Sequence, residues 1–364
     1  MVRYTRSKVT RKTPTTRSRS DRVRGAHGAS GSSKKLESHW GIIGNTPIVE
    51  RLRRTITIGP DIHAFLLSGT SGIGKTTLAT SLTNALICSA PIEGNACQTC
   101  KDCTFLLQHR HPDVISVTDG DETIGIEHVR GITASLQRRP TVSSRHVVQI
   151  DRIERMTEEA SNAFLKTLEE PYGATMFVLT TDRPHLVPFT ILSRCSVFHC
   201  TQVPEHAIKD HLIDTGVATV DARHIAAVAD GRPAYALRLA RQREVYDQAR
   251  EDAESLLALI GAVPYERIRI AETIAAHKEG SARMSAVLNC WESTIRRMLR
   301  IAVGLPDHGP GAETIRALVT SMMTVPAIIG LARQLQTMRE RIRTSGNIRL
   351  NIESFSLHLP TSRL

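Results

Sequence analysis

Residues 63–88 restrict the possible folds of this 364-residue chain more than any other stretch. An apolar run at residues 64–67 leads into the sequence GTSGIGKT, and an amphipathic run with an apolar residue every three to four positions follows. This order of strand, glycine-rich loop and helix is the context that a P-loop requires. A glycine-rich turn can precede a helix by chance, but here every fixed position and both flanking elements agree. We therefore expect an α/β domain that binds a nucleoside triphosphate.

Each part of the loop has an expected chemical role. Backbone N–H groups of a curled glycine-rich loop point at phosphate oxygens, and the helix N-terminus adds partial positive charge. The lysine is expected to reach the outer phosphates, and the hydroxyl after it to bind Mg²⁺. The predicted ATP-binding residues of the loop are Gly69, Thr70, Ser71, Gly72, Ile73, Gly74, Lys75 and Thr76.

The net charge of +11 belongs mainly to the first part of the chain. Residues 1–35 contain eleven Lys and Arg and the single acid Asp21, a net charge of +10, so about +1 is left for the rest. The scarcity of large apolar side chains predicts disorder over residues 1–36. A non-specific contact with DNA, an organellar transit peptide and a solvated extension are the three interpretations.

The remaining composition is ordinary for a soluble protein. No apolar run approaches the roughly 18 residues of a membrane span. We therefore expect a cytoplasmic protein with no membrane partner.

Four of the seven cysteines are closely spaced after the predicted P-loop helix. Cys88, Cys97, Cys100 and Cys103 follow the pattern C-x8-C-x2-C-x2-C, in a loop without periodicity of its own. Four thiolates at this spacing can surround one tetrahedral Zn²⁺, and the metal would order a loop that lacks a core. Disulfides are the alternative, but a nucleotide-binding protein without a secretory signal points to a reducing compartment. We therefore predict a zinc site.

Strands and helices alternate in the rest of the N-terminal part. Strands are predicted at residues 114–118, 146–151 and 175–181, separated by helices that begin near residues 126 and 158. Asp151 ends the second of these strands, where a P-loop protein is expected to carry its Mg²⁺-associated acid. Such alternation predicts a parallel doubly wound sheet with the nucleotide at the carboxyl ends of the strands.

Helical patterns replace strands after about residue 200. We expect a nucleotide-binding core at residues 37–200, with the zinc module at 88–103 inside it. A small helical lid is expected at residues 201–243 and a larger helical domain at 244–364.

Several motifs resemble one known family. The cysteine loop, NAFLKTLEEP at residues 162–171 and FVLTTDRPHLVPFTILSRC at 177–195 are similar to the bacterial clamp loader of DNA polymerase III, an AAA+ assembly. The stretches at residues 111–114, 231–239 and 347–360 favour its delta-prime subunit type over the gamma/tau motor type. The resemblance implies an AAA+ P-loop core, a helical lid and, at residues 244–364, an all-helical collar domain for oligomerisation.

The resemblance also implies roles for single residues and for partners. Asp151 falls on the Mg²⁺-associated aspartate, and Thr181 falls on the sensor of the γ-phosphate. Arg194 falls on an arginine finger that acts on the nucleotide site of a neighbouring subunit, with a strand-end salt bridge as the simpler alternative. The implied partners are the gamma/tau and delta subunits in a hetero-oligomeric ring, the sliding clamp and primed DNA.

Two departures from the motor type limit the enzymatic interpretation. Arg152 stands where the motor has a glutamate that positions the attacking water, and an arginine has no lone pair to accept a proton. Glu154 is not expected to substitute, because the strand and its exit fix the side-chain direction. Ala234 stands at the position of the motor's lid arginine. We expect ATP binding with weak or absent turnover; the alternative is a gamma/tau-like motor, and an unrelated P-loop kinase or helicase would not explain the zinc loop.

Overall fold

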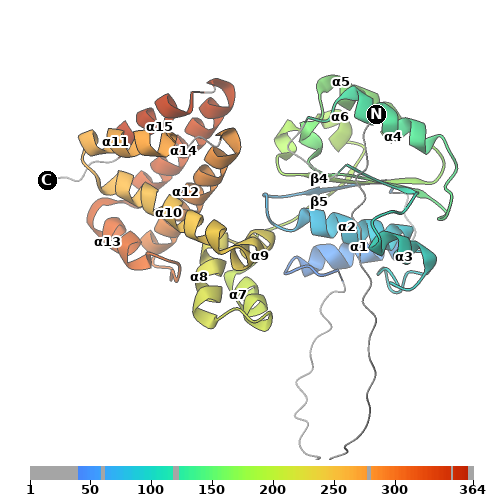
Figure 1. Ribbon diagram of the computed structural model, residues 1–364, viewed down its shortest axis with the longest axis horizontal. Helices are drawn as coiled ribbons and strands as arrows, with labels where there is room; N and C mark the ends of the chain where they lie inside the picture. The colour runs from blue at the N-terminus through green and yellow to red at the C-terminus, as the bar shows by residue number, and fades with distance from the viewer. Residues whose placement is uncertain (1–39, 59–61, 118–122, 277–279, 346, 360–364) are drawn as a thin grey trace, which may run out of the picture. The chain divides into compact units, whose positions relative to one another are not determined.

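The computed structural model describes residues 40–58, 62–117, 123–276, 280–345 and 347–359 (Figure 1). The predicted tail at residues 1–36 and the predicted strand end at Thr118 lie outside the described residues. The sheet-containing part consists of α1 (Thr46–Ile58), β1 (Ala64–Ser68), α2 (Lys75–Ile87), α3 (Lys101–Leu107), β2 (Val114–Val117), α4 (Ile126–Leu136), β3 (His146–Ile150), the 3₁₀-helix η1 (Ile153–Arg155), α5 (Glu158–Glu169), β4 (Thr175–Thr181), the 3₁₀-helix η2 (Pro184–Leu186), α6 (Phe189–Leu192) and β5 (Ser196–His199). The helices that follow are α7 (Glu205–Asp214), α8 (Thr219–Ala229), α9 (Pro233–Arg241), α10 (Arg243–Gly261), α11 (Pro264–Ala275), α12 (Gly280–Ala302), α13 (Ala312–Met322), α14 (Val325–Ser345) and α15 (Ile348–Leu357).

The strands of the described residues form one parallel sheet in the order β2-β3-β4-β1-β5. Strand β1 pairs with β4 on one side and with β5 on the other, so that Ser68 lies in register with both Thr181 and His199. All the pairings are parallel, and the carboxyl ends of the strands therefore meet at one edge of the sheet. This edge is where ligands bind in open α/β sheets.

Helices cover both faces of the sheet (Figure 1). Helices α1, α2 and α3 lie on one face, and α4, α5 and α6 lie on the other. Phe65 and Leu67 of β1 belong to the apolar cluster that contains α1 and α2, whereas Ala64 and Leu66 belong to the cluster that contains α4, α5 and α6. Because successive side chains of a strand point to opposite faces, a sheet covered on both sides requires nearly continuous apolar strands. The predicted α/β fold with a parallel, doubly wound sheet is confirmed.

Two elements differ from the sequence-based expectation. Strand β5 was not predicted, because only the two central residues of its sequence SVFH are apolar. Helix α3 begins at Lys101, within the segment that was expected to be an irregular loop, so the prediction was wrong for Cys103, which lies on this helix.

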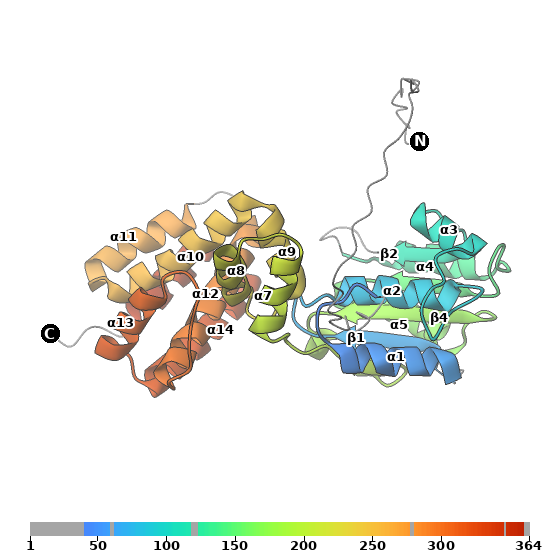
Figure 2. The same ribbon diagram turned by 90° about the horizontal axis from the view of Figure 1, so that it is seen from below.

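Only helices follow β5 among the described residues. Helices α7, α8 and α9 pack with the start of α10 around an apolar cluster that includes Ile208, Ala226 and Leu239. Helices α10 to α15 form a second group, which we call the C-terminal helical cluster (Figures 1 and 2). At its centre, Trp291 is fully buried and stacks on Phe355 with 5.5 Å between the ring centroids.

No single helix among the described residues is long and apolar enough to cross a membrane. Within the described ranges, one pair of segments, Ala312–Met322 with Val325–Ile342, passes by length and composition together, but the two segments are bent by 113° relative to each other.

Candidate functional site

The P-loop leaves β1 at the carboxyl edge of the sheet. The N–H of Gly69 donates to the carbonyl oxygen of Thr181 on β4 at 3.2 Å. A Cβ atom on Gly69 would lie 2.7 Å from the carbonyl oxygen of Cys200, so only glycine fits there. Gly72 has a φ of +80°, and a Cβ atom at this position would lie 3.3 Å from the side chain of Tyr235. Two glycines of the motif are therefore required by close approach and by backbone conformation.

Helix α2 begins directly at the end of this loop. Gly74 is its N-cap and provides no side-chain cap, so the N–H groups of the first turn remain available to an anion. The side chain of Lys75 is 5% exposed. Its ammonium nitrogen donates to the carbonyl oxygens of Gly69 and Thr70, both at 2.8 Å, and lies 2.5 Å from a carboxylate oxygen of Asp182.

Asp151 lies directly after β3, beside the first turn of α2. It is 4% exposed, and the hydroxyl of Thr180 donates to its carboxylate at 3.3 Å. Burial raises the pKa of Asp151, and hydrogen bonds from the Thr76 and Thr180 side chains act in the opposite direction. Thr76 and Asp151, the two residues predicted for Mg²⁺, are therefore brought together. A hydroxyl and a carboxylate suit this ion, which takes few protein ligands beside water and phosphate oxygens.

Thr181, the predicted sensor, is fully buried at the end of β4. Its hydroxyl oxygen accepts the N–H of Arg183 at 3.1 Å. The preceding residue, Thr180, is the one that contacts Asp151, and its hydroxyl oxygen also accepts the N–H of Arg152 at 3.0 Å. Thr181 thus lies at the carboxyl edge of the sheet. Its hydroxyl oxygen already accepts a hydrogen bond from the local backbone.

The backbone turns sharply after Asp151. Arg152 adopts a left-handed conformation with a φ of +53°, and η1 follows. This turn brings Glu154 back to β4, where its Oε1 atom accepts the N–H of Asp182 at 3.0 Å. The other oxygen of Glu154 is buried and has no hydrogen-bond partner among the described residues. A carboxylate therefore reaches the carboxyl edge of the sheet, although the sequence indicated no such contact.

Helix α9 contacts the tip of the P-loop. The N–H of Ala234 in its first turn donates to the carbonyl oxygen of Gly72 at 3.0 Å. Arg232, at the N-cap, places its guanidinium 4.7 Å from the ring centroid of Tyr235. Ala234 thus contacts the P-loop through its backbone, and its methyl side chain adds no charge there.

The four predicted zinc ligands form one cluster. The sulfur atoms of Cys88, Cys97, Cys100 and Cys103 all lie within 4.8 Å of one another. The hydrogen-bonded sulfur pairs are 3.5 to 3.9 Å apart. A disulfide needs about 2.05 Å, whereas four sulfurs at about 2.3 Å from a tetrahedral zinc would be about 3.8 Å apart. The cluster could therefore hold a metal ion, and its spacing fits zinc.

Backbone hydrogen bonds favour the thiolate form of one cysteine in the cluster. The N–H of Thr99, followed by that of Cys100, lowers the pKa of Cys97 to about 6. Burial raises the pKa of Cys88 and of Cys103. Cys100 is also the N-cap of α3 and accepts the N–H of Cys103 at 3.4 Å. The cluster therefore links the end of α2 to the start of α3.

Arg194 follows α6 and makes local contacts. Its guanidinium donates to the carbonyl oxygen of Thr190 at 2.8 Å and to the hydroxyl of Ser193 at 3.2 Å. It also forms an ion pair with Glu169 at the end of α5. The salt bridge considered as the simpler alternative is thus present, while 35% of the arginine side chain stays exposed to solvent.

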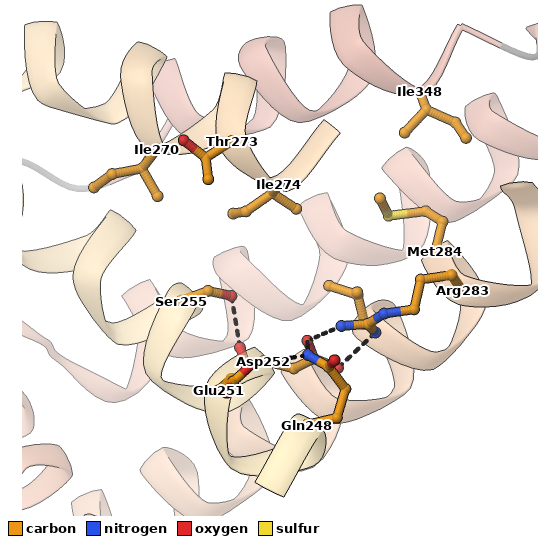
Figure 3. Close-up of a pocket in the computed structure, with 11 residues that line it drawn as sticks. Gln248, Glu251, Asp252, Ser255, Ile270, Thr273, Ile274, Arg283, Met284 and Ile348 are labelled. Atoms are coloured by element: carbon orange, nitrogen blue, oxygen red, sulfur yellow. Dashed lines mark hydrogen bonds and ion pairs between the residues drawn. The ribbon is translucent and has the colours of Figure 1, made fainter. Parts of the chain in front are cut away.

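A cavity of about 250 Å³ lies within the C-terminal helical cluster (Figure 3). Ile270, Ile274, Met284, Val287 and Ile348 form much of its apolar wall. On the polar side, Asp252 accepts two hydrogen bonds from Arg283, at 2.5 and 2.8 Å, and one from Gln248 at 3.4 Å. These polar groups bind one another, so they stabilise the helix packing.

Two acids at these sites were not predicted from the sequence. Asp182 directly follows a predicted strand, so the rule that identified Asp151 at the end of β3 could have identified it as well. Glu169 belongs to the LEEP motif, but nothing in its sequence context indicates Arg194 as its partner.

Comparison with known proteins identifies similar sequences. A family model described as DNA polymerase III, delta subunit, matches residues 44–204. A DNA polymerase III subunit gamma from Buchnera aphidicola subsp. Acyrthosiphon pisum is 32% identical over 272 residues, which are 71% of this chain and 75% of that protein. A subunit delta' from Haemophilus influenzae is 33% identical over 195 residues, which are 52% of this chain and 59% of that protein.

A solved structure of a DNA polymerase III gamma subunit-related protein from Thermotoga maritima aligns with a TM-score of 0.42 and 20% identity. The alignment covers 85% of this chain and 98% of that one. The chain spans about half the length of some relatives: it covers 47% of a subunit tau from Salmonella typhimurium, which is 26% identical over 317 residues and matches 83% of this chain.

Proposed function

Because the chain belongs to the AAA+ clamp-loader family of DNA polymerase III subunits, we propose that it acts as a delta-prime type of subunit. In this role it would help to load the sliding clamp during DNA replication. It would bind ATP with little turnover of its own and would assist hydrolysis at the site of a neighbouring subunit.

The observation that carries the proposal is the residue after Asp151. Arg152 is a cation in a left-handed turn, where hydrolysis would require a group that orients water. Glu154 reaches the same edge, but its Oε1 atom is bonded to the backbone of Asp182. The first turn of α9 offers Ala234 in place of an arginine. A site with these features can hold a nucleotide without the groups that accelerate its hydrolysis.

The P-loop, Lys75 and Thr76 would hold Mg²⁺-ATP together with Asp151, and Thr181 would respond to the γ-phosphate. The loop N–H groups and the start of α2 suit phosphate oxygens, and the Thr76 hydroxyl and the Asp151 carboxylate suit Mg²⁺. The cysteine cluster would hold a structural Zn²⁺, since four cysteine ligands leave no open position for catalysis.

Arg194 would act outside its own chain. Its planar guanidinium has donors suited to phosphate oxygens, and more than a third of its side chain is exposed. An arginine supplied in trans is worth roughly 10³ to 10⁵ in rate in related NTPases. In this proposal, Arg194 leaves Glu169 for the γ-phosphate of a neighbouring subunit when the ring closes.

The proposed organisation follows from this assignment. Residues 37–200 would be the AAA+ core with the zinc module at 88–103, residues 201–243 the lid, and residues 244–364 the collar that joins the ring. The partners would be gamma/tau and delta subunits, the sliding clamp and primed DNA in the cytoplasm.

A gamma/tau-like motor that hydrolyses ATP itself is the second candidate. Its support is the intact P-loop with Lys75 and Thr76, and the similarity to gamma subunits over 71% of the chain. Arg152 and Ala234 weigh against it.

ATP turnover by the purified chain, alone and in a reconstituted ring with motor and delta subunits, tests the proposal. We expect negligible turnover by the chain alone. In the ring, Arg194→Ala should remove the neighbouring site's share of clamp-stimulated turnover, and Arg194→Lys should restore little of it, because an ammonium lacks the planar fork.

Arg223→Ala, which removes an exposed arginine from α8, is the matched control and should leave turnover unchanged. Folding and assembly should survive Arg194→Ala, since one partly exposed ion pair contributes at most about 1 kcal/mol. Normal turnover and clamp loading by the Arg194→Ala ring would disprove the action in trans. Rapid turnover by the isolated chain that Lys75→Ala abolishes would establish the motor type instead.

A further inference from the structure

The ammonium group of Lys75 already has three acceptors in its own chain. The carbonyl oxygens of Gly69 and Thr70 lie at 2.8 Å, and the Asp182 carboxylate lies at 2.5 Å. An ammonium group has three N–H donors, so these contacts use all of them. A phosphate oxygen can bind Lys75 only if one of the three acceptors leaves.

Asp182 is the acceptor whose side chain can exchange. Gly69 and Thr70 offer backbone oxygens of the P-loop itself, which are fixed by the fold of the loop. The side chain of Asp182 is 21% exposed, whereas that of Lys75 is 5% exposed. The aspartate is therefore the more solvent-accessible partner of the pair.

The backbone of Asp182 is held in place from two sides. Its own N–H donates to Glu154 at 3.0 Å, and the next N–H, that of Arg183, donates to Thr181 at 3.1 Å. Asp182 also follows β4 directly, and β4 is the neighbour of β1 in the sheet. The strand order thus places the Asp182 carboxylate beside the P-loop. A rotation of this side chain alone would move the carboxylate away from Lys75.

We propose that Asp182 is a positioning residue of the nucleotide site that competes with phosphate for Lys75. Its carboxylate takes the position of an anionic ligand, and a nucleoside di- or triphosphate must displace it to bind. A charged phosphate and a carboxylate cannot share one ammonium without mutual repulsion. Asp182 therefore lowers the affinity for nucleotide while it stabilises the free protein. This inference rests on the proposed nucleotide binding.

The test is calorimetric titration of the full chain with Mg²⁺-ATP and Mg²⁺-ADP, in the wild type and in Asp182→Asn. The amide is nearly isosteric and can still accept from Lys75, but it carries no charge. We expect the Kd for ATP to fall by about tenfold or more, because removal of a like charge favours the incoming anion. Lys75→Ala should abolish binding. Asp214→Asn, which removes an exposed carboxylate from α7, controls for the change in net charge and should leave the Kd unchanged.

Thermal unfolding without ligand separates competition from a structural role. Asp182→Asn should lower the melting temperature of the free protein, since a buried lysine loses its anionic partner. A merely structural role would weaken stability and nucleotide binding together, whereas competition changes them in opposite directions.

The outcomes distinguish this inference from the proposed function. If Lys75→Ala abolishes binding while Asp182→Asn binds as the wild type does or more weakly, the competition is disproved and the nucleotide site stands. If neither the wild type nor any variant binds nucleotide, or if nucleotide binding survives Lys75→Ala, both the P-loop assignment and the competition are wrong.

Discussion

The carboxylate of Asp113 fixes the turn after α4 to the start of β2. It is 1% exposed and accepts the N–H groups of Thr141, Val142 and Ser143, at 2.7 to 2.8 Å, as well as the Thr141 hydroxyl at 2.8 Å. Burial alone would raise the pKa of Asp113, but these hydrogen bonds outweigh burial and lower it to about 2. Ionised Asp113 therefore stabilises the folded state.

This depressed pKa predicts how the stability depends on pH. The contribution is complete above the unfolded-state pKa of about 3.9 and is lost as the pH falls toward 2. Asp113→Asn should lower the free energy of unfolding by about 2 kcal/mol at pH 7 and by about half of that at pH 3. Urea unfolding at both values measures the difference, with the exposed Asp210→Asn as control. A difference that is equal at both pH values would assign the loss to packing instead of charge.

The cysteine cluster leads to a prediction about metal content. Protein purified without chelator should contain about one Zn²⁺ per chain. Cys100→Ser should lose it and loosen the loop between α2 and α3, because this sulfur also caps α3. Elemental analysis measures the metal, and Cys195→Ser, outside the cluster, should retain it. Metal-free wild-type protein would remove the zinc assignment.

Among the helices, α11 secures the ends of two others through Arg267. This side chain is 1% exposed and donates to the carbonyl oxygens of Ile260 and Ala262 at the end of α10. It also donates to those of Ser356 and Leu359 at the end of α15. The last carbonyl groups of a helix lack intrahelical partners and carry partial negative charge, so a guanidinium stabilises them.

Removal of this guanidinium should release α15 from the C-terminal helical cluster. Arg267→Met would leave buried carbonyl groups without their donor, and we expect a loss of about 3 kcal/mol in the free energy of unfolding. Hydrogen exchange should show the earliest opening at α15. The control is Arg269→Met, which changes an exposed arginine on the same helix and should have little effect. Unchanged exchange of α15 in Arg267→Met would show that the apolar contacts alone hold it.

For the molecule as a whole, the sequence predicted elements better than their order in space. The sequence predicted the P-loop, the strands that correspond to β2, β3 and β4, and the acid at the end of β3, because each depends on local spacing. It did not predict the pairing of Lys75 with Asp182, since this pairing exists only because β4 lies beside β1. The pairing of Glu169 with Arg194 similarly depends on how α5 and α6 pack.

Helix α2 gives this molecule a fixed internal distance. Its first residues, Lys75 and Thr76, belong to the P-loop motif, and Cys88 of the cysteine cluster follows its last residue. At about 1.5 Å per residue, thirteen helical residues span about 20 Å. The helix therefore keeps its two ends at a constant separation. A paramagnetic ion at each end would give a known separation, against which distances to other subunits of an assembly could be calibrated.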